Sequence, residues 1–352
     1  MKKSISTILL AGLSLFYSKN YAQDTTLGTT GLKINGSADV YWKYDFAKHS
    51  NINTFFTEDQ NSISLGMLDL AISKNTGKAF FVGELSFGPR GQYRSLLNGD
   101  QNPTNADNSF HLQNLYIDYA FTDKLNLTAG FMGTFVGYEV ISPTANFHYS
   151  TSYLFGAGPF QNAGIKATYS FSDKISGMIG LFNDWNTYQD FNGISHIGSQ
   201  ISITPNEKTN VYLNFLTGSS EGGNSNYSSG TLLDLVANYS FNNKFSLGIN
   251  ATDYSFKSDG GYYGAALYPK FSIQDNIGIG LRGEYFKVKD EGGLSGDAKT
   301  ALTLTGNFKH GGLVFIPELR WDNSKLKEFT KSDLITATPN AIQFSAALVY
   351  SF

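Results

Sequence analysis

The chain lacks cysteine, is poor in charge, and has no long apolar run beyond its first 22 residues. Without cysteine there can be no disulfide scaffold, thiolate metal site, cysteine nucleophile or lipoprotein anchor. Charged residues make up 16% of the 352 residues, whereas about a quarter is usual for a globular protein. No later run approaches the ~20 apolar residues that a membrane-spanning helix needs, which excludes a helical membrane protein. A net charge of -3 argues against nucleic acid as a partner.

The first 22 residues form a segment of their own. Lys2 and Lys3 precede an apolar stretch over residues 5–16, and small and polar residues follow up to Ala22. This order is typical of a secretory signal peptide. We predict cleavage after Ala22, which leaves an exported domain over residues 23–352.

The dominant pattern in that domain is a period of two. Over residues 32–46, the even positions are Leu, Ile, Gly, Ala, Val, Trp, Tyr and Phe, and the odd positions are mostly Lys, Asn, Ser and Asp. The same alternation recurs over residues 125–132, 245–252 and 342–352. One apolar and one polar face over such lengths indicates β-strands long enough to cross a bilayer when tilted.

The connections between these strands alternate in length. Residues 119–125, 169–175 and 239–245 share the pattern Tyr-X-Phe, a tight polar turn with Asp or Asn, Lys, and then the next strand, which is a hairpin signature. Seven such short turns alternate with eight longer loops rich in Gly, Asn and Ser. We therefore predict an all-β fold, a transmembrane antiparallel up-and-down β-barrel of about sixteen strands.

Two segments fit this pattern less well. In residues 63–72 the apolar parity switches, so that Asp69 falls on the apolar face unless a β-bulge near Gly66 restores the phase. The strand expected to begin at Ile175 alternates weakly and is expected to reach Trp185.

Aromatic residues gather at the predicted strand ends. Trp42, Trp185 and Trp321 lie near the long loops, where we predict one aromatic girdle. The opposite girdle, on the side of the short turns, is predicted to contain Tyr119, Phe121, Tyr169, Phe171, Tyr239, Phe241 and Phe352.

Charged residues on the polar parity are predicted to line the pore. The cations are Lys33, Lys43, Lys166, Lys270, Arg282 and Arg320, and the anions are Asp39, Asp45, Glu84, Asp118, Asp234, Glu284, Glu318 and Asp322. A barrel of sixteen strands is too wide for side chains alone to fill, so these charges imply a water-filled lumen. Their balance predicts a weak preference for cations.

The loop over residues 137–159 is more aromatic and less charged than the other long loops. Its notable residues are Tyr138, Asn146, Phe147, Tyr149, Tyr153 and Phe155. A loop made for solvent would not carry so many rings. We predict that it folds into the barrel and narrows the pore.

Motifs that suggest chemistry lack the context that chemistry needs. A G-x-G-x-x-G match at residues 278–283 continues a strand, and a G-x-S-x-G match at residues 218–222 lies in a polar loop. The five histidines show no metal-ligand spacing. We expect no catalytic, cofactor or metal site, and no enzyme activity.

Residues 138–153 read YEVISPTANFHYSTSY, followed by Gly158-Pro159-Phe160 and Gly164-Ile165-Lys166. This stretch resembles the OmpL-like putative β-barrel porin family, a Bacteroidetes-type outer-membrane porin, and the resemblance extends over essentially the whole exported domain. It implies an outer-membrane channel and carries over no substrate residues. The closing Tyr350-Ser351-Phe352 is similar to the terminal aromatic signal that outer-membrane assembly machinery recognises.

The predicted function is that of a porin in the outer membrane of a Gram-negative bacterium, through which small hydrophilic solutes diffuse passively. Its expected partners are outer-membrane lipid, those solutes, the assembly machinery through Phe352, and further copies in a homotrimer by analogy with other porins. One alternative is a sugar-selective or oligosaccharide-selective channel, with Tyr41, Tyr116, Tyr212 and Tyr268 as inward stacking residues. Others are a closed structural or adhesion barrel, and a lipid-acting barrel enzyme, which would require a Ser/His pair or a calcium-linked site.

Overall fold

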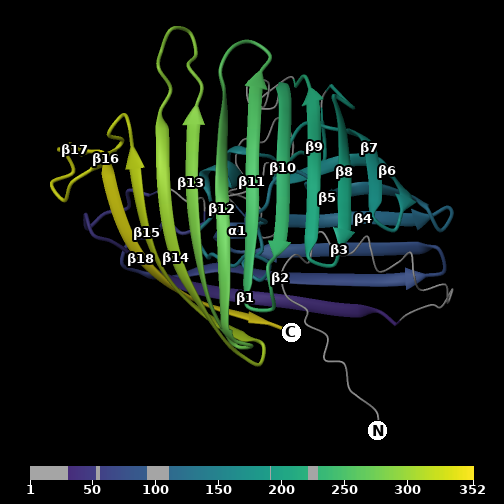
Figure 1. Ribbon diagram of the computed structural model, residues 1–352, viewed down its shortest axis with the longest axis horizontal. Helices are drawn as coiled ribbons and strands as arrows, with labels where there is room; N and C mark the ends of the chain where they lie inside the picture. The colour runs from purple at the N-terminus through teal and green to yellow at the C-terminus, as the bar shows by residue number, and fades with distance from the viewer. Residues whose placement is uncertain (1–30, 53–55, 93–110, 191, 221–228) are drawn as a thin grey trace.

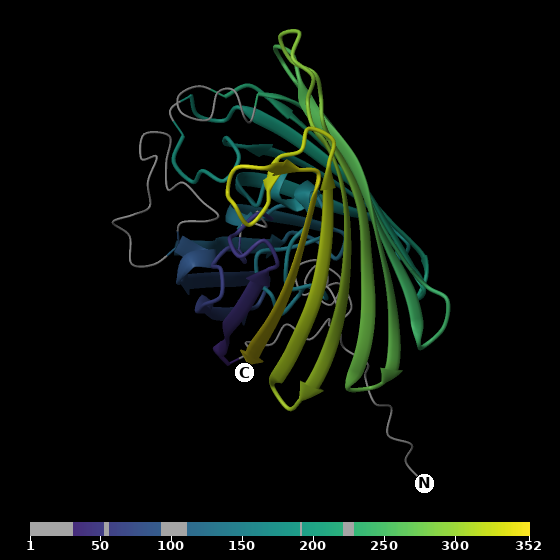
Figure 2. The same ribbon diagram turned by 90° about the vertical axis from the view of Figure 1, so that its left-hand side faces the viewer.

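The computed structural model describes residues 31–52, 56–92, 111–190, 192–220 and 229–352. These residues form a closed antiparallel β-barrel (Figures 1 and 2), as the alternating pattern predicts. The predicted signal peptide, residues 1–22, lies outside the described residues.

The wall consists of long strands joined in sequence order. Its strands are β1 (Lys33–Asp45), β2 (Ile63–Thr76), β3 (Ala79–Phe87), β4 (His111–Ala120), β5 (Leu125–Gly133), β6 (Gln161–Ser172), β7 (Ile175–Phe182), β8 (His196–Asn206), β9 (Thr209–Gly218), β10 (Gly230–Ser240), β11 (Phe245–Phe256), β12 (Gly261–Gln274), β13 (Ile277–Val288), β14 (Ala298–His310), β15 (Leu313–Ser324) and β18 (Asn340–Ser351). These are the sixteen predicted strands.

The remaining elements lie in the long loops. The short strands β16 (Phe329–Thr330) and β17 (Ala337–Thr338) pair with each other between β15 and β18. The helices α1 (Pro89–Gln92) and α2 (Tyr153–Ala157) have four and five residues. Within the described ranges, no helix is long and apolar enough to cross a membrane.

The barrel closes between its first and last strands. Ser37 of β1 lies opposite Ser351 of β18, and the pairing continues to Asp45 opposite Gln343. Beyond the last strand, Gly36 and Phe352 exchange two backbone hydrogen bonds of 3.1 and 3.0 Å. Closure leaves neither strand with an unpaired edge.

The short turns are stabilised by their own polar side chains. Asn242 accepts hydrogen bonds from the backbone N–H groups of Lys244 and Phe245, at 2.8 and 2.9 Å. Thr122 accepts in the same way from Lys124 and Leu125, at 3.2 and 3.0 Å. This local bonding explains why the turn sequence repeats along the chain.

Successive residues of a wall strand face opposite sides of the barrel. In β10, Thr231 and Leu233 are exposed on the outer face, whereas Leu232, Asp234 and Val236 are buried on the inner face. Across the wall, the exposed outer positions are mainly large apolar side chains, and many of the buried inner positions are charged or polar.

Most of the predicted girdle residues lie on the outer face. Tyr169, Phe171, Tyr239, Phe241 and Phe352 are exposed there, beside the short turns. Tyr119 and Phe121, which are also exposed, form a ring pair with centroids 4.9 Å apart. Trp42 and Trp321 are half-buried on the outward parity of β1 and β15.

Trp185 contradicts the girdle prediction. It is only 2% exposed and packs against Tyr254, whose inner-face ring lies 4.9 Å away. β7 ends at Phe182, so the strand parity does not extend to Trp185, and the chain turns inward through Asn186, which has a positive φ of 64°. Asn186 Oδ1 fixes that turn by accepting from the backbone N–H groups of Phe160 and Gln161.

The predicted bulge at Gly66 is present. Ala38 pairs with Leu68 and Val40 pairs with Leu65, so Asp39 alone faces both Gly66 and Met67. The extra residue puts the apolar side chains before and after it on the outer face and turns Asp69 inward, where it is buried.

The bulge provides a test of packing inside the barrel. A Cβ atom at Gly66 would lie 1.8 Å from Asp39 Oδ2, and that carboxylate already accepts the Met67 N–H at 3.0 Å. We expect Gly66→Ala to lower the free energy of unfolding by about 1–3 kcal/mol, measured by urea titration in detergent. The control is Gly133→Ala, because a Cβ there meets only Asn114 at 3.9 Å. Equal stability of the two variants would contradict this account of the bulge.

Candidate functional site

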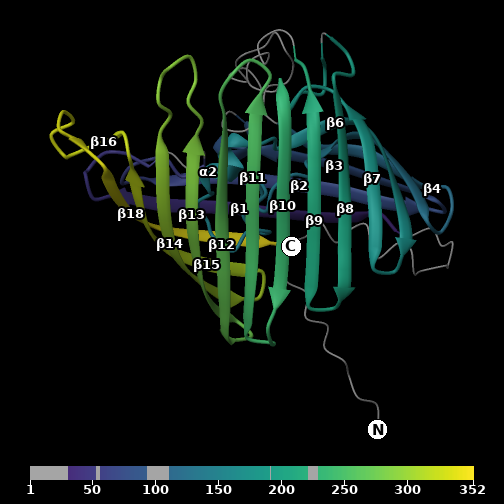
Figure 3. The same cartoon turned by 45° about the horizontal axis from the view of Figure 1, so that its top comes forward.

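The third long loop, residues 134–160, joins β5 to β6 and contains α2. From here on it is called the third loop. Its contacts extend to the inner faces of β1, β10 and β13–β15, so it lies across the barrel interior. Figure 3 shows its helix α2 inside the ring of strands. Most of its residues are buried, although its tip, residues 142–147, is mainly half-buried.

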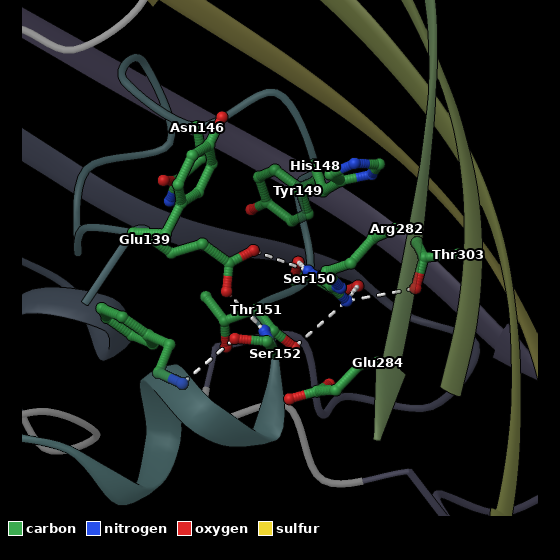
Figure 4. A network of polar contacts seen from close by, with 12 residues as sticks. Glu139, Asn146, His148, Tyr149, Ser150, Thr151, Ser152, Arg282, Glu284 and Thr303 are labelled. Atoms are coloured by element: carbon green, nitrogen blue, oxygen red, sulfur yellow. Dashed lines mark hydrogen bonds and ion pairs between the residues drawn. The ribbon is translucent and has the colours of Figure 1, made fainter. Parts of the chain in front are cut away.

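Arg282 of β13 binds the middle of the third loop (Figure 4). Its Nη1 donates to Glu139 Oε1 at 2.7 Å and to the carbonyl of Ser150 at 2.6 Å. Its Nη2 donates to the carbonyl of Thr151 at 3.3 Å and to Thr303 Oγ1 on β14 at 3.1 Å. The Arg282 side chain is fully buried, so this network joins two wall strands to the loop away from solvent.

Two further arginines hold loop carbonyl groups. Arg320 of β15 donates to the carbonyl of Thr151 at 2.7 Å, and Asp322 fixes its guanidinium through bonds of 2.8 and 2.9 Å. Arg90 of α1 donates to the carbonyls of Ile141 and Tyr149, at 3.0 and 3.3 Å. Arg90 lies in a loop and not on a strand, so the alternating pattern gave no reason to single it out.

Wall carboxylates bind the backbone N–H groups of the loop. Glu318 accepts from Tyr149 and Ser150 at 2.9 and 3.2 Å. Glu284 accepts from Tyr153 and Leu154 at 3.0 and 2.8 Å, at the start of α2. Asp234 of β10 likewise accepts from Gly137 at 2.9 Å. Hydrogen bonds to ionised groups are stronger than neutral ones, so both signs of wall charge fix the loop.

These contacts correct the pore-lining prediction. The following predicted residues point inward but are buried: Asp39, Lys43, Asp45, Asp234, Arg282, Glu284, Glu318, Arg320 and Asp322. The prediction that they face water is wrong, because loops cover them. Glu84, Asp118, Lys166 and Lys270 are half-buried on the inner face, and Lys33 is exposed at the start of β1.

The aromatic residues of the third loop mostly serve to anchor it. Tyr149 and Phe155 are buried, and Tyr153 donates to Asp322 at 2.6 Å. Tyr138 stacks on Tyr268 of β12, with ring centroids 4.1 Å apart, and donates to Asn238 at 3.1 Å.

Local bonds and small wall residues shape the tip. The Asn146 side chain accepts a hydrogen bond from the Val140 N–H at 3.0 Å and donates one to the Val140 carbonyl at 2.6 Å. Phe147 packs over Gly278 and Gly280 of β13, where a Cβ atom would lie 3.3 and 2.4 Å from its ring. The first two glycines of the G-x-G-x-x-G match therefore make room for this ring.

His148 is held neutral. Burial lowers its pKa well below the ordinary value, and the nearby charge of Arg282 lowers the pKa further. Its Nδ1 lies 2.7 Å from Thr305 Oγ1 on β14. This histidine therefore adds no charge to the loop near neutral pH.

The half-buried charges of β3–β6 lie on a different part of the wall. Glu84 accepts from Asn114 at 2.5 Å, and Asp118 accepts from Thr128 at 2.7 Å. Lys166 lies close enough to Asp118 for their charges to interact. The half-buried side chains of the inner face also include Lys270, Tyr116 and Tyr212.

The predicted ladder of stacking tyrosines is not continuous. Tyr41 is buried beside Tyr149, and Tyr268 is buried beneath Tyr138. Tyr116 and Tyr212 are half-buried. The interpretation of Tyr41 and Tyr268 as solute-stacking residues is therefore wrong.

Ser195 and His196 form a Ser/His contact beside an acidic side chain. Ser195 Oγ lies 2.7 Å from His196 Nδ1 and donates to Asp184 at 2.7 Å, while Asp184 lies 3.6 Å from the same ring nitrogen. In a catalytic triad the acid orients one ring nitrogen while the serine bonds to the other. This arrangement differs, because serine and acid approach the same nitrogen. Within the part of the chain that the structure describes, no group of three His, Asp or Glu side chains could hold a metal ion.

Comparison with known proteins agrees with this architecture. The family model described as "Putative beta-barrel porin-2, OmpL-like" matches residues 31–352. Among curated proteins, no match was found.

Solved structures match over most of their length at low identity. OmpF of Salmonella typhi, in complex with daunomycin, has a TM-score of 0.62 and 12% identity, and the match covers 91% of this chain and 97% of that one. For the anion-selective porin from Comamonas acidovorans the TM-score is 0.61, with 11% identity and coverage of 92% and 100%. For the trimer form of OmpT from Vibrio cholerae it is 0.60, with 10% identity and coverage of 92% and 100%. These likenesses support the barrel fold.

Proposed function

Because this chain belongs to the putative beta-barrel porin-2, OmpL-like family, we propose that it forms a water-filled outer-membrane channel for passive diffusion of small hydrophilic solutes. The observation that carries the proposal is a closed barrel of sixteen strands whose inner face carries many charged side chains and whose interior is crossed by an anchored loop. A barrel of this size has room for an aqueous passage. The test is single-channel conductance of the purified protein in a planar bilayer.

In this proposal the third loop sets the size limit. Its tip, residues 142–147, narrows the passage, and Glu84, Asp118 and Lys166 line the opposite side. Arginines and carboxylates bind the loop backbone at many points, so the constriction is rigid and excludes solutes by size. The channel stays open without a gating movement.

A barrel closed to solutes is the second candidate, and the aromatic packing inside the barrel favours it. Phe135, Phe182 and Trp185 form one buried cluster with Tyr254 and Tyr262 on the side of β7–β12. If this cluster and the third loop fill the lumen completely, planar bilayers will show no conductance steps. Steady ohmic conductance would support the open channel.

The half-buried wall charges predict weak ion selectivity. Glu84 and Asp118 are balanced by Lys166 and Lys270, and Lys309 adds one half-buried cation near the short turns. Loops cover the other inward charges, so those charges do not support a cation preference. We expect the wild type to have a reversal potential near zero in a salt gradient. In Lys166→Gln the reversal potential should shift toward the value of a cation-selective channel, because one positive charge is removed from the passage. The control is Lys331→Gln, which alters an exposed lysine of the last loop. A strongly selective wild type, or no shift in Lys166→Gln, would contradict the assignment of Lys166 to the passage.

The same proposal extends to location and partners. Family membership supports the outer membrane of a Gram-negative bacterium, to which a signal peptide over residues 1–22 would direct the chain. The exposed Phe352 would be the aromatic terminus read by the assembly machinery. A homotrimer is proposed because one structurally similar porin is described in a trimer form. Chemical crosslinking of the protein in isolated outer membranes would test it.

A further inference from the structure

A groove lies on the outer face of the barrel near the ends of β7–β11, on the side of the long loops. Its volume is about 640 Å³. Much of its lining forms one row across five neighbouring strands, in which each residue is paired with the next. The row is Leu181, Ile197, Thr217, Thr231 and Ser255. These side chains point away from the interior, so the groove is separate from the proposed passage.

The side chains of the row change from apolar at one end to polar at the other. Leu181 and Ile197 are apolar and 44% and 41% exposed on the outer face. Thr217 and Thr231 share a hydrogen bond of 2.8 Å between their hydroxyl oxygens, and Ser255 adds a third hydroxyl. The groove thus has an apolar end and a hydroxyl-rich end.

Lys257 adds a positive charge at the hydroxyl-rich end. It follows directly after the end of β11 and donates to Ser219 Oγ at 3.2 Å, which uses one of the three N–H donors of its ammonium group. Among the described residues, the lining of the groove contains the Lys257 cation and no carboxylate. Asp253 and Lys289, which pair at 2.8 Å, both contact Ser255: Lys289 donates to Ser255 Oγ at 2.8 Å, and Ser255 Oγ donates to Asp253 at 3.4 Å. Asp290 pairs with Lys287 at 3.1 Å.

The gradient runs in the direction expected at the surface of a membrane. Leu181 and Ile197 lie within strands, in the apolar outer face, whereas Lys257 lies beyond a strand end. Tyr263 and Tyr285, a pair on the outer face of β12 and β13 with ring centroids 6.3 Å apart, lie beside the polar end. Tyrosines are enriched at the level of lipid head groups.

We propose that this groove binds a phosphorylated lipid of the outer leaflet. The phosphate of its head group is held by the ammonium group of Lys257, beside the hydroxyl groups of Thr231 and Ser255, and an acyl chain lies along Ile197 and Leu181. A lipid fits better than a protein segment, because the groove is small and its polarity follows the depth of the bilayer. The unused N–H donors of the Lys257 ammonium group suit the acceptor oxygens of a phosphate group.

The test is lipid binding by the full-length protein in detergent, followed by native mass spectrometry. The probe is diphosphoryl lipid A, with its chemically dephosphorylated form as the comparison. We expect the wild type to prefer the phosphorylated form, and Lys257→Gln to weaken its binding by about tenfold, as loss of one hydrogen bond to a charged group implies. Thr231→Val, which removes a hydroxyl and keeps the shape, should weaken it less.

The control variant is Lys331→Gln, which should bind lipid A as the wild type does. The proposal is overturned if Lys257→Gln binds equally well, if both lipid forms bind equally, or if inorganic phosphate alone displaces the lipid completely. It is also overturned if Lys257→Gln changes the oligomeric state while leaving lipid binding intact, since that would assign the groove to a second copy. Lys257 faces away from the lumen, so conductance should be unchanged in this variant whether or not the channel proposal holds.

Discussion

Replacing residues 138–158 with a short glycine–serine linker should raise the single-channel conductance severalfold. The third loop crosses the barrel interior, and its removal would uncover the inner faces of β13–β15. Arg282, Glu284, Glu318 and Arg320 would then face water, and the passage would widen toward the full width of a barrel of sixteen strands. The measurement is conductance in planar bilayers, together with the largest neutral polymer that still enters the channel.

The matched control is removal of residues 331–336 from the last loop. These residues contain the turn between β16 and β17, and they are exposed and lie away from the third loop. Conductance should stay at the wild-type value in that variant. Unchanged conductance after replacement of the third loop would show that the constriction lies elsewhere.

Arg282→Met should be the most destabilising single substitution in the buried network. It leaves Glu139 buried without its cation and removes the donors to the carbonyls of Ser150 and Thr151. Breaking one partner of a buried ion pair costs about 3–5 kcal/mol. The free energy of unfolding can be measured by urea titration, with tryptophan fluorescence as the probe, because Trp185 is buried in the interior packing.

A second substitution separates charge from packing. Glu139→Gln combined with Arg282→Met should recover part of the lost stability, because no uncompensated carboxylate remains buried. The control is Lys289→Met, which breaks an exposed ion pair of similar length, 2.8 Å to Asp253, and should cost about 0.2–1 kcal/mol. If the double variant is no more stable than Arg282→Met alone, the charge of Glu139 is not the source of the loss.

Strand order and direction could be predicted because they depend on local patterns. A period of two assigns each side chain to a face, and the repeated turns at Thr122 and Asn242 use side chains only two or three residues away. Even the bulge at Gly66 is visible, because a one-residue insertion shifts the apolar parity of the strand. Each of these features is encoded within about ten neighbouring residues.

The interior of the barrel could be predicted only in part. Parity indicates that Arg320 and Glu318 point inward, but it says nothing about what covers them. Their partners in the third loop are about 170 residues away in the chain. For the same reason the alternating pattern did not indicate Arg90 and placed Trp185 on the wrong face. Both residues lie outside strands and take their positions from distant contacts.

The pairing of Ser37 with Ser351 has a consequence for how the molecule is made. During export, β1 emerges first and its partner β18 emerges last, so one edge of β1 stays unpaired until almost the whole chain has been delivered. An unpaired edge is a template for pairing with other chains, and contacts this distant in sequence form slowly. A chain shortened at its C-terminus would therefore remain an open sheet, and we expect such a chain to be degraded or to aggregate before it reaches the membrane.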